Sequence, residues 1–97
     1  MVVDDHERSR AAARAAVRAA GGEVAAEATR CADVAAVAER ARPDVAIFAV
    51  GLADGDGIAA AAAVTAAHGV PVVLSTSHAG DGLVARAREA GVMAWLT

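Results

Sequence analysis

The chain has 97 residues, enough for one small domain, and 57% of them are apolar while only 2% are aromatic. Alanine supplies more than half of the apolar residues, so each larger apolar side chain contributes an unusual share of the core. The nine basic residues are all arginine, and the net charge of −3 argues against nucleic-acid binding by this domain itself. No apolar run approaches the ~20 residues of a membrane span, and no signal peptide is evident. The single Cys31 excludes an internal disulfide, so we expect a cytoplasmic protein with a free thiol.

Strand and helix patterns alternate along the whole chain. The sequence predicts strands at residues 1–3, 23–29, 45–50, 72–74 and 92–96. It predicts helices at residues 7–20, 32–42, 58–68 and 81–90, three of them followed by Gly21, Pro43 or Gly69 and the last capped by Gly91. On the first helix Arg10, Arg14 and Arg18 are four residues apart, and we expect them to form a solvated face, with a face toward a partner protein as the alternative.

The apolar run at residues 45–50 is the strand around which the other elements are arranged. It is about six residues long and is closed off by glycines and aspartates, which favours a strand buried on both faces over a helix. Such strands belong to parallel sheets with helices on either side, and chemistry collects beyond their carboxyl ends. The residue that ends this strand near the crevice is Ala49, whose methyl group can neither attack a substrate nor bind a metal.

The alternation predicts one α/β domain over residues 1–97, with a doubly wound parallel five-stranded sheet of flavodoxin-like type. Right-handed crossovers favour the strand order 2-1-3-4-5.

Several short segments at one edge of this sheet resemble a known family when taken together. They are Val3-Asp4-Asp5-His6, Pro43-Asp44-Val45, Asp56-Gly57, Pro71-Val72-Val73 with Thr76, and Ala90-Gly91-Val92-Met93-Ala94-Trp95-Leu96. Their order and spacing resemble the receiver domain of bacterial two-component response regulators over essentially the whole chain. The Asp-Asp-His start resembles regulators with a helix-turn-helix output, whereas Leu83 to Leu96 is closer to receivers joined to an RNA-binding antitermination (ANTAR) output. The resemblance also implies a last helix covering the fifth strand, which this chain lacks.

The resemblance implies roles for particular residues. In the family a phosphohistidine passes its phosphoryl group to an aspartate at the end of the third strand, with Mg²⁺ held by an acidic pair. By position, Asp4 and Asp5 match the metal-binding acids and the carbonyl of Gly51 matches the backbone metal ligand. Thr76 and Trp95 match the switch residues. Ala49 occupies the phosphoacceptor position, so the resemblance implies no catalytic residue and only weak Mg²⁺ binding. The family's active-site lysine would follow Thr97.

Each of these residues also has a simpler structural interpretation. Asp4 and Asp5 could be carboxylates favoured by the dipole at a helix start. Thr76 could simply end a strand, and Trp95 could be a core or surface residue. Asp54 and Asp56 fit turn formers in a glycine-rich loop better than substitute phosphoacceptors.

We therefore expect a receiver domain in phosphorelay signalling that is not phosphorylated at Ala49 and acts through protein contacts or dimerisation. Its expected partners are a histidine kinase, another regulator protein or a second copy of the chain, with no membrane partner. RNA or DNA binding would belong to an output domain outside the chain. The alternative is a flavodoxin-like domain that binds a small ligand in the same crevice. The absence of a glycine-rich phosphate loop argues against that alternative, and Asp4 and Asp5 would repel anions. An enzyme is a third hypothesis, and no nucleophile–base pair supports it.

Overall fold

The computed structural model of the protein describes residues 1–75, 81–89, 91 and 94–96. Its strands are β1 (Val2–Val3), β2 (Glu27–Ala28), β3 (Ala46–Ala49), β4 (Gly51–Leu52), β5 (Gly55–Asp56), β6 (Val72–Ser75) and β7 (Ala94–Leu96). Its helices are α1 (Glu7–Ala19), α2 (Cys31–Ala41), α3 (Gly57–His68) and α4 (Asp81–Glu89). None of the helices in these ranges is long and apolar enough to cross a lipid bilayer.

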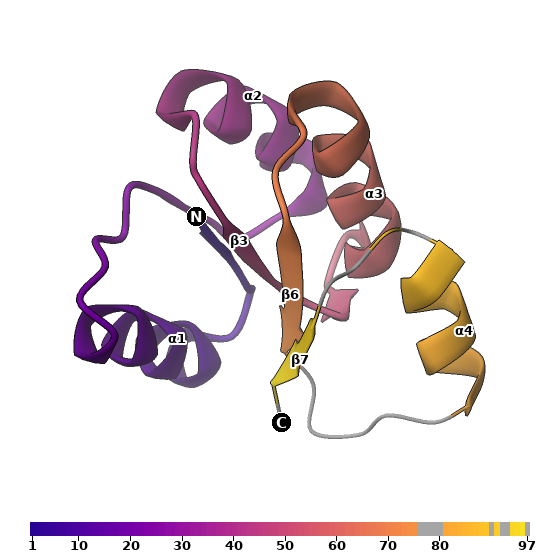
Figure 1. Ribbon diagram of the computed structural model, residues 1–97, viewed down its shortest axis with the longest axis horizontal. Coiled ribbons are helices and arrows are strands. Elements are labelled where there is room, and N and C mark those ends of the chain that lie inside the picture. Colours follow the sequence, from indigo (N-terminus) through magenta and orange to yellow (C-terminus); the bar gives the residue numbers. More distant parts are fainter. Residues whose placement is uncertain (76–80, 90, 92–93, 97) are drawn as a thin grey trace.

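Five strands form one parallel sheet in the order β2-β1-β3-β6-β7. This confirms the predicted parallel sheet and its order. β4 and β5 pair only with each other, antiparallel, and form a small hairpin at residues 51–56, where the sequence predicts only a loop. Figure 1 shows α1 alone on one side of the sheet and α2, α3 and α4 on the other.

The two faces of the sheet are buried to different degrees. Val3, Phe48 and Leu74 are neighbours across β1, β3 and β6, and each is 0% exposed. Ile47 and Val73 alternate with them along β3 and β6, on the opposite face, and are only half-buried. The core cluster joins Val3, Phe48 and Leu74 to the buried residues of α2 and α3, so the core lies mainly between the sheet and these two helices. Burying one large apolar side chain stabilises a fold by ~1.5–3 kcal/mol. α1 contributes no buried residue. The covering last helix implied by the resemblance stays a prediction.

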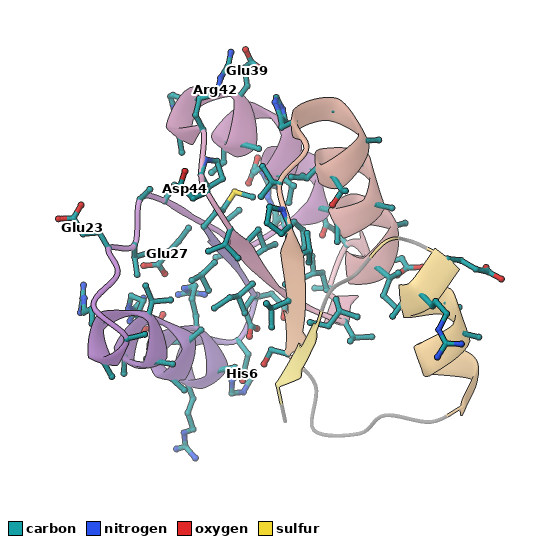
Figure 2. The ribbon with its side chains drawn as sticks, viewed as in Figure 1. His6, Glu23, Glu27, Glu39, Arg42 and Asp44 are labelled. Carbon is teal, nitrogen blue, oxygen red and sulfur yellow. The ribbon has the colours of Figure 1, made fainter. Side chains whose placement is uncertain are left out.

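The arginine row of α1 is paired with acids over most of its length, so the expectation of a solvated face is wrong for two of its three members. Arg10 Nε and Arg14 Nη1 lie 3.0 and 2.7 Å from Glu27 Oε1 on β2, and both arginines also pair with Glu7. Their side chains are 16% and 24% exposed, and Figure 2 shows Glu27 between β2 and α1. Only Arg18 is exposed as expected. The network joins α1 to the edge strand of the sheet, a contact that a helical repeat of arginines does not reveal by itself.

The second strand is much shorter than predicted. It covers Glu27 and Ala28 alone, opposite Val2 and Val3 of β1. Because β1 offers only these two residues for pairing, the preceding segment at residues 23–26 has little backbone to pair with, despite its alternating pattern.

The end of α2 holds a strained residue, Arg42, with φ 49° and ψ 57°. This left-handed conformation costs a residue with a Cβ roughly 1 kcal/mol, whereas glycine adopts it freely. We therefore expect Arg42→Gly to raise the free energy of unfolding by ~0.5–1 kcal/mol. The change removes an exposed ion pair with Glu39, which lies beside Arg42 at this end of α2 (Figure 2) and contributes little.

Urea denaturation followed by circular dichroism would measure this effect. Ala41→Gly is the matched control, because Ala41 is the last helical residue and a glycine there should lower stability by ~0.5–1 kcal/mol. Equal destabilisation by both substitutions would show that the conformation of Arg42 carries no strain.

Candidate functional site at the carboxyl edge of the sheet

The carboxyl ends of three neighbouring strands meet at one edge of the sheet. Ala49 ends β3 and lies opposite Ser75, which ends β6. Asp4 follows β1 directly, and the register that places Val3 opposite Phe48 puts Asp4 next to Ala49. The N–H of Asp4 still donates to the carbonyl of Ala28, 3.1 Å away, so Asp4 continues the line of β1 beside β2. The strand ends therefore bring Asp4, Ala49 and Ser75 together, as the sequence predicts for the first two.

Asp4 is the only polar residue buried in the described part of the chain, and it is 6% exposed. Its Oδ1 accepts a hydrogen bond of 2.9 Å from the N–H of His6, and its carbonyl accepts one of 3.0 Å from Arg10 Nη1. Figure 2 shows His6 at this end of the molecule, opposite Arg42 and Asp44. Burying a carboxylate is costly unless it is hydrogen-bonded, and the His6 N–H offsets part of that cost. The N-cap of α1 is His6, so Asp4 bonds just ahead of the helix and does not cap it.

Asp5 has a different environment from its neighbour. It is exposed, and its Oδ2 accepts a hydrogen bond of 2.7 Å from the N–H of Ala53. Ala53 lies in the turn between β4 and β5, 48 residues further along the chain. Asp5 therefore ties the segment after β1 to the hairpin that follows β3.

Asp54 and Asp56 belong to this hairpin, and both carboxylates are bonded to neighbouring helices. This agrees with their interpretation as structural residues. Asp54 accepts hydrogen bonds of 2.8 and 3.1 Å from the N–H groups of Cys31 and Ala32, the first two residues of α2. Asp56 is the N-cap of α3, and its Oδ1 accepts from the N–H of Ile58 at 2.9 Å. The other oxygen of Asp56 pairs with Arg86 of α4.

These partners change the acidity of the side chains. The N–H groups of Cys31 and then Ala32 hold the pKa of the Asp54 carboxyl below its ordinary value. Burial works to raise the pKa of Asp56, but Arg86 and the N–H groups at the start of α3 outweigh it and leave that pKa lowered. Burial, followed by the charge of Asp54, raises the pKa of the Cys31 thiol. Cys31 is therefore a neutral thiol at neutral pH and not an activated nucleophile.

The sequence offered a signal for one of these contacts and none for the other. An aspartate directly before a helix is a typical N-cap, so Asp56 could have been assigned to the start of α3. Asp54 bonds a helix that begins 23 residues earlier in the chain, and no local pattern predicts such a pairing.

Comparison with known proteins adds the family. Residues 1–97 match the family described as the response regulator receiver domain. The chain belongs to this family. The transcriptional regulatory protein PdtaR of Mycobacterium tuberculosis (strain ATCC 25618 / H37Rv) is 36% identical to it over 80 residues. That match covers 82% of this chain but 39% of PdtaR, so the chain spans about two fifths of the length of this curated relative.

Solved receiver structures have the same fold. A two-component response regulator of the LuxR family from Aurantimonas sp. SI85-9A1 superposes with a TM-score of 0.88 at 28% identity, over 98% of this chain and 69% of that one. The chemotaxis protein CheY4 of Vibrio cholerae superposes with a TM-score of 0.86 at 25% identity, over 99% and 82%. The chain is therefore a receiver domain with the flavodoxin-like α/β fold.

The structure describes some of the predicted receiver-site residues and not others. Asp4 and Ala49 lie side by side, and Gly51 is exposed in β4, opposite Asp56. Thr76 lies outside the described residues. The backbone of Trp95 lies in β7 opposite Leu74, but its side chain is outside the described part. The switch roles of Thr76 and Trp95 stay predictions.

The residues present do not complete a Mg²⁺ site. Mg²⁺ requires near-octahedral oxygen coordination and is bound in proteins through carboxylates. Asp4 and Asp5 each have one carboxylate oxygen bonded to a backbone N–H, and Ala49, next to Asp4, contributes only a methyl group. Within the described ranges, no group of three or more His, Cys, Asp or Glu side chains could hold a metal ion.

A cavity of about 350 Å³ lies at the opposite, amino edge of the sheet. It is lined mainly by apolar residues and backbone, among them Val17, Val24, Pro43 and Val45. The flavodoxin-like alternative places a ligand in the crevice at the carboxyl edge, so this cavity does not support it.

Proposed function

We propose that this chain is the receiver domain of a transcriptional regulator and that it works through protein contacts without being phosphorylated at position 49. The observation that carries the proposal is Ala49 at the end of β3, next to Asp4 and opposite Ser75. A carboxylate at this point is the nucleophile of the family's reaction, and a methyl group cannot replace it. The regulatory setting is supported by the relative named as a transcriptional regulatory protein.

The partners follow from this proposal. The partner that binds by shape and charge would be a histidine kinase, another regulator or a second copy of the chain. The domain itself would be a cytoplasmic regulator and not an enzyme. RNA or DNA binding would belong to an output domain, of the ANTAR or helix-turn-helix type, and the net charge of −3 is consistent with this division. Any binding of Mg²⁺ at Asp4, Asp5 and the carbonyl of Gly51 would be weak.

A phosphoryl mimic tests the proposal directly. A two-state switch responds only to a ligand that binds one of the states better than the other. Without a carboxylate at position 49, beryllofluoride has no oxygen to attach to, so we expect the fluorescence of Trp95, the single tryptophan, to stay unchanged on titration with beryllofluoride and Mg²⁺.

The comparison variant is Ala49→Asp, which restores the attachment point in the same chain. A saturable change in the fluorescence of the native chain, at concentrations that also act on Ala49→Asp, would contradict the proposal. Such a change would show that the native crevice still binds the mimic.

A further inference from the structure

Three aspartates attach the hairpin β4–β5 to the segment after β1 and to the helices α2, α3 and α4. Asp5 binds its turn from the segment after β1, and Asp54 binds α2. Asp56 caps α3 and pairs with Arg86 of α4. The hairpin is also anchored from within, because Leu52 is 8% exposed and belongs to the core.

The bond from Asp54 compensates for a missing cap. The first N–H groups of any helix lack intrahelical partners and need an acceptor from elsewhere. The N-cap residue of α2 is Arg30, whose side chain makes no capping hydrogen bond. Asp54 supplies an oxygen to each of the N–H groups of Cys31 and Ala32, and its negative charge also suits the positive end of the helix dipole.

Asp5 is one of the two acids that the family resemblance assigns to metal binding, and here it accepts a hydrogen bond from the hairpin. Its Oδ2 lies 2.7 Å from the N–H of Ala53, the residue next to Asp54. A charged carboxylate makes a stronger hydrogen bond to a backbone N–H than a neutral acceptor does. Two adjacent hairpin residues, Ala53 and Asp54, are therefore held by charge-assisted bonds to two separate elements.

We propose that Asp5, Asp54 and Asp56 form an aspartate clamp that fixes the hairpin in a single position, so that the carboxyl edge of this sheet is ordered without a divalent cation. Asp5 is then an anchor of the hairpin and not primarily a metal ligand. The ion pair between Asp56 and Arg86 also links α4 to the hairpin.

Amide hydrogen exchange measured by NMR on the 97-residue chain tests the clamp. In the native chain the amides of Cys31, Ala32 and Ala53 should be protected, and millimolar Mg²⁺ should leave their exchange rates unchanged. Asp54→Ala should speed exchange at Cys31 and Ala32 roughly tenfold or more, because a bond to a charged acceptor is lost. Asp5→Ala should do the same at Ala53.

The matched control is Asp33→Ala, which removes a carboxylate from the same first turn of α2. Asp33 pairs with Arg30 and accepts no hydrogen bond from Cys31 or Ala32, so these amides should exchange at native rates. If Asp54→Ala does not fold, Asp54→Asn keeps one uncharged acceptor and should still speed exchange at the same two amides.

Two results would overturn the clamp. One is a slowing of exchange at these amides when Mg²⁺ is added to the native chain, which would mean that a cation orders the edge. The other is unchanged exchange at Cys31 and Ala32 in the folded Asp54 variants. Neither result bears on phosphorylation at position 49, which the beryllofluoride titration tests separately.

Discussion

Gly57→Ala should lower the free energy of unfolding by ~3 kcal/mol or more, because no side chain fits at this position. A Cβ on Gly57 would overlap the carbonyl oxygen of Ala49 and lie 2.8 Å from that of Val50. Both atoms are backbone, so they cannot turn aside as the end of a flexible side chain could. The N–H of Gly57 also donates to the carbonyl of Val50 at 2.9 Å, and separating the two segments would break this bond.

Urea denaturation of the variant measures the loss, and Gly51→Ala, in the hairpin that precedes Gly57, is the control. A Cβ on Gly51 would meet no atom within 4 Å, so that variant should stay within ~0.5 kcal/mol of the native chain. If the two variants unfold at the same urea concentration, Gly57 of α3 does not lie against the backbone at the end of β3. A large difference would show that Gly57 sets the distance between α3 and Ala49.

The central strands could be predicted because their signal is local. The apolar run at residues 45–50 is too short for a helix and is bounded by turn residues, and β3 lies within it at Ala46–Ala49. Once β3 is placed in a parallel sheet, the right-handed crossover rule leaves few strand orders, and the predicted one is observed. The position of Asp4 beside Ala49 follows from the same reasoning, because Asp4 directly follows β1 and Ala49 ends the neighbouring strand β3.

The hairpin could not be predicted because its pairing depends on its surroundings. Gly51, Gly55 and Asp56 belong to residue types that are rare in strands, and each strand has only two residues. Its position is fixed by the core contact of Leu52 and by bonds to Asp5 and to the start of α2. Those partners lie more than 20 residues away in the sequence, beyond the reach of any local pattern.

The pairing of the α1 arginines with Glu27 could not be predicted for the same reason. Arg10 and Arg14 are spaced like an exposed helical face, and this spacing is all that the sequence displays. Which side of α1 meets β2 depends on how the helix packs on the sheet. Glu27 lies on that side and binds both arginines. A charged row on a helix therefore does not show whether the row is solvated until the neighbouring strand is placed.

Ala49→Asp should bind Mg²⁺ with an affinity ~10-fold or more above that of the native chain, because it adds a carboxylate ligand to the two already present. The new carboxylate would stand next to Asp4, and repulsion between them should lower the melting temperature when no divalent cation is present. Mg²⁺ would relieve this repulsion, so the melting temperature of Ala49→Asp should rise with Mg²⁺ while that of the native chain stays constant. Thermal scans with and without chelator measure both effects, and Ala35→Asp, an exposed position on α2, controls for the added charge.

The same pair of proteins decides whether position 49 is where a phosphoryl group would attach. Incubated with a small phosphodonor and Mg²⁺, the native chain should keep its mass, because no carboxylate nucleophile remains at the end of β3. Asp54 and Asp56 are poor substitutes, since the oxygens of both are already bonded to helix N–H groups or to Arg86. Mass spectrometry that found a hydroxylamine-sensitive phosphate on the native chain would sink this account. Mapping that phosphate to Asp54 or Asp56 would mean that a bond holding the hairpin had opened to release the nucleophile, so the aspartate clamp would have to be reversible.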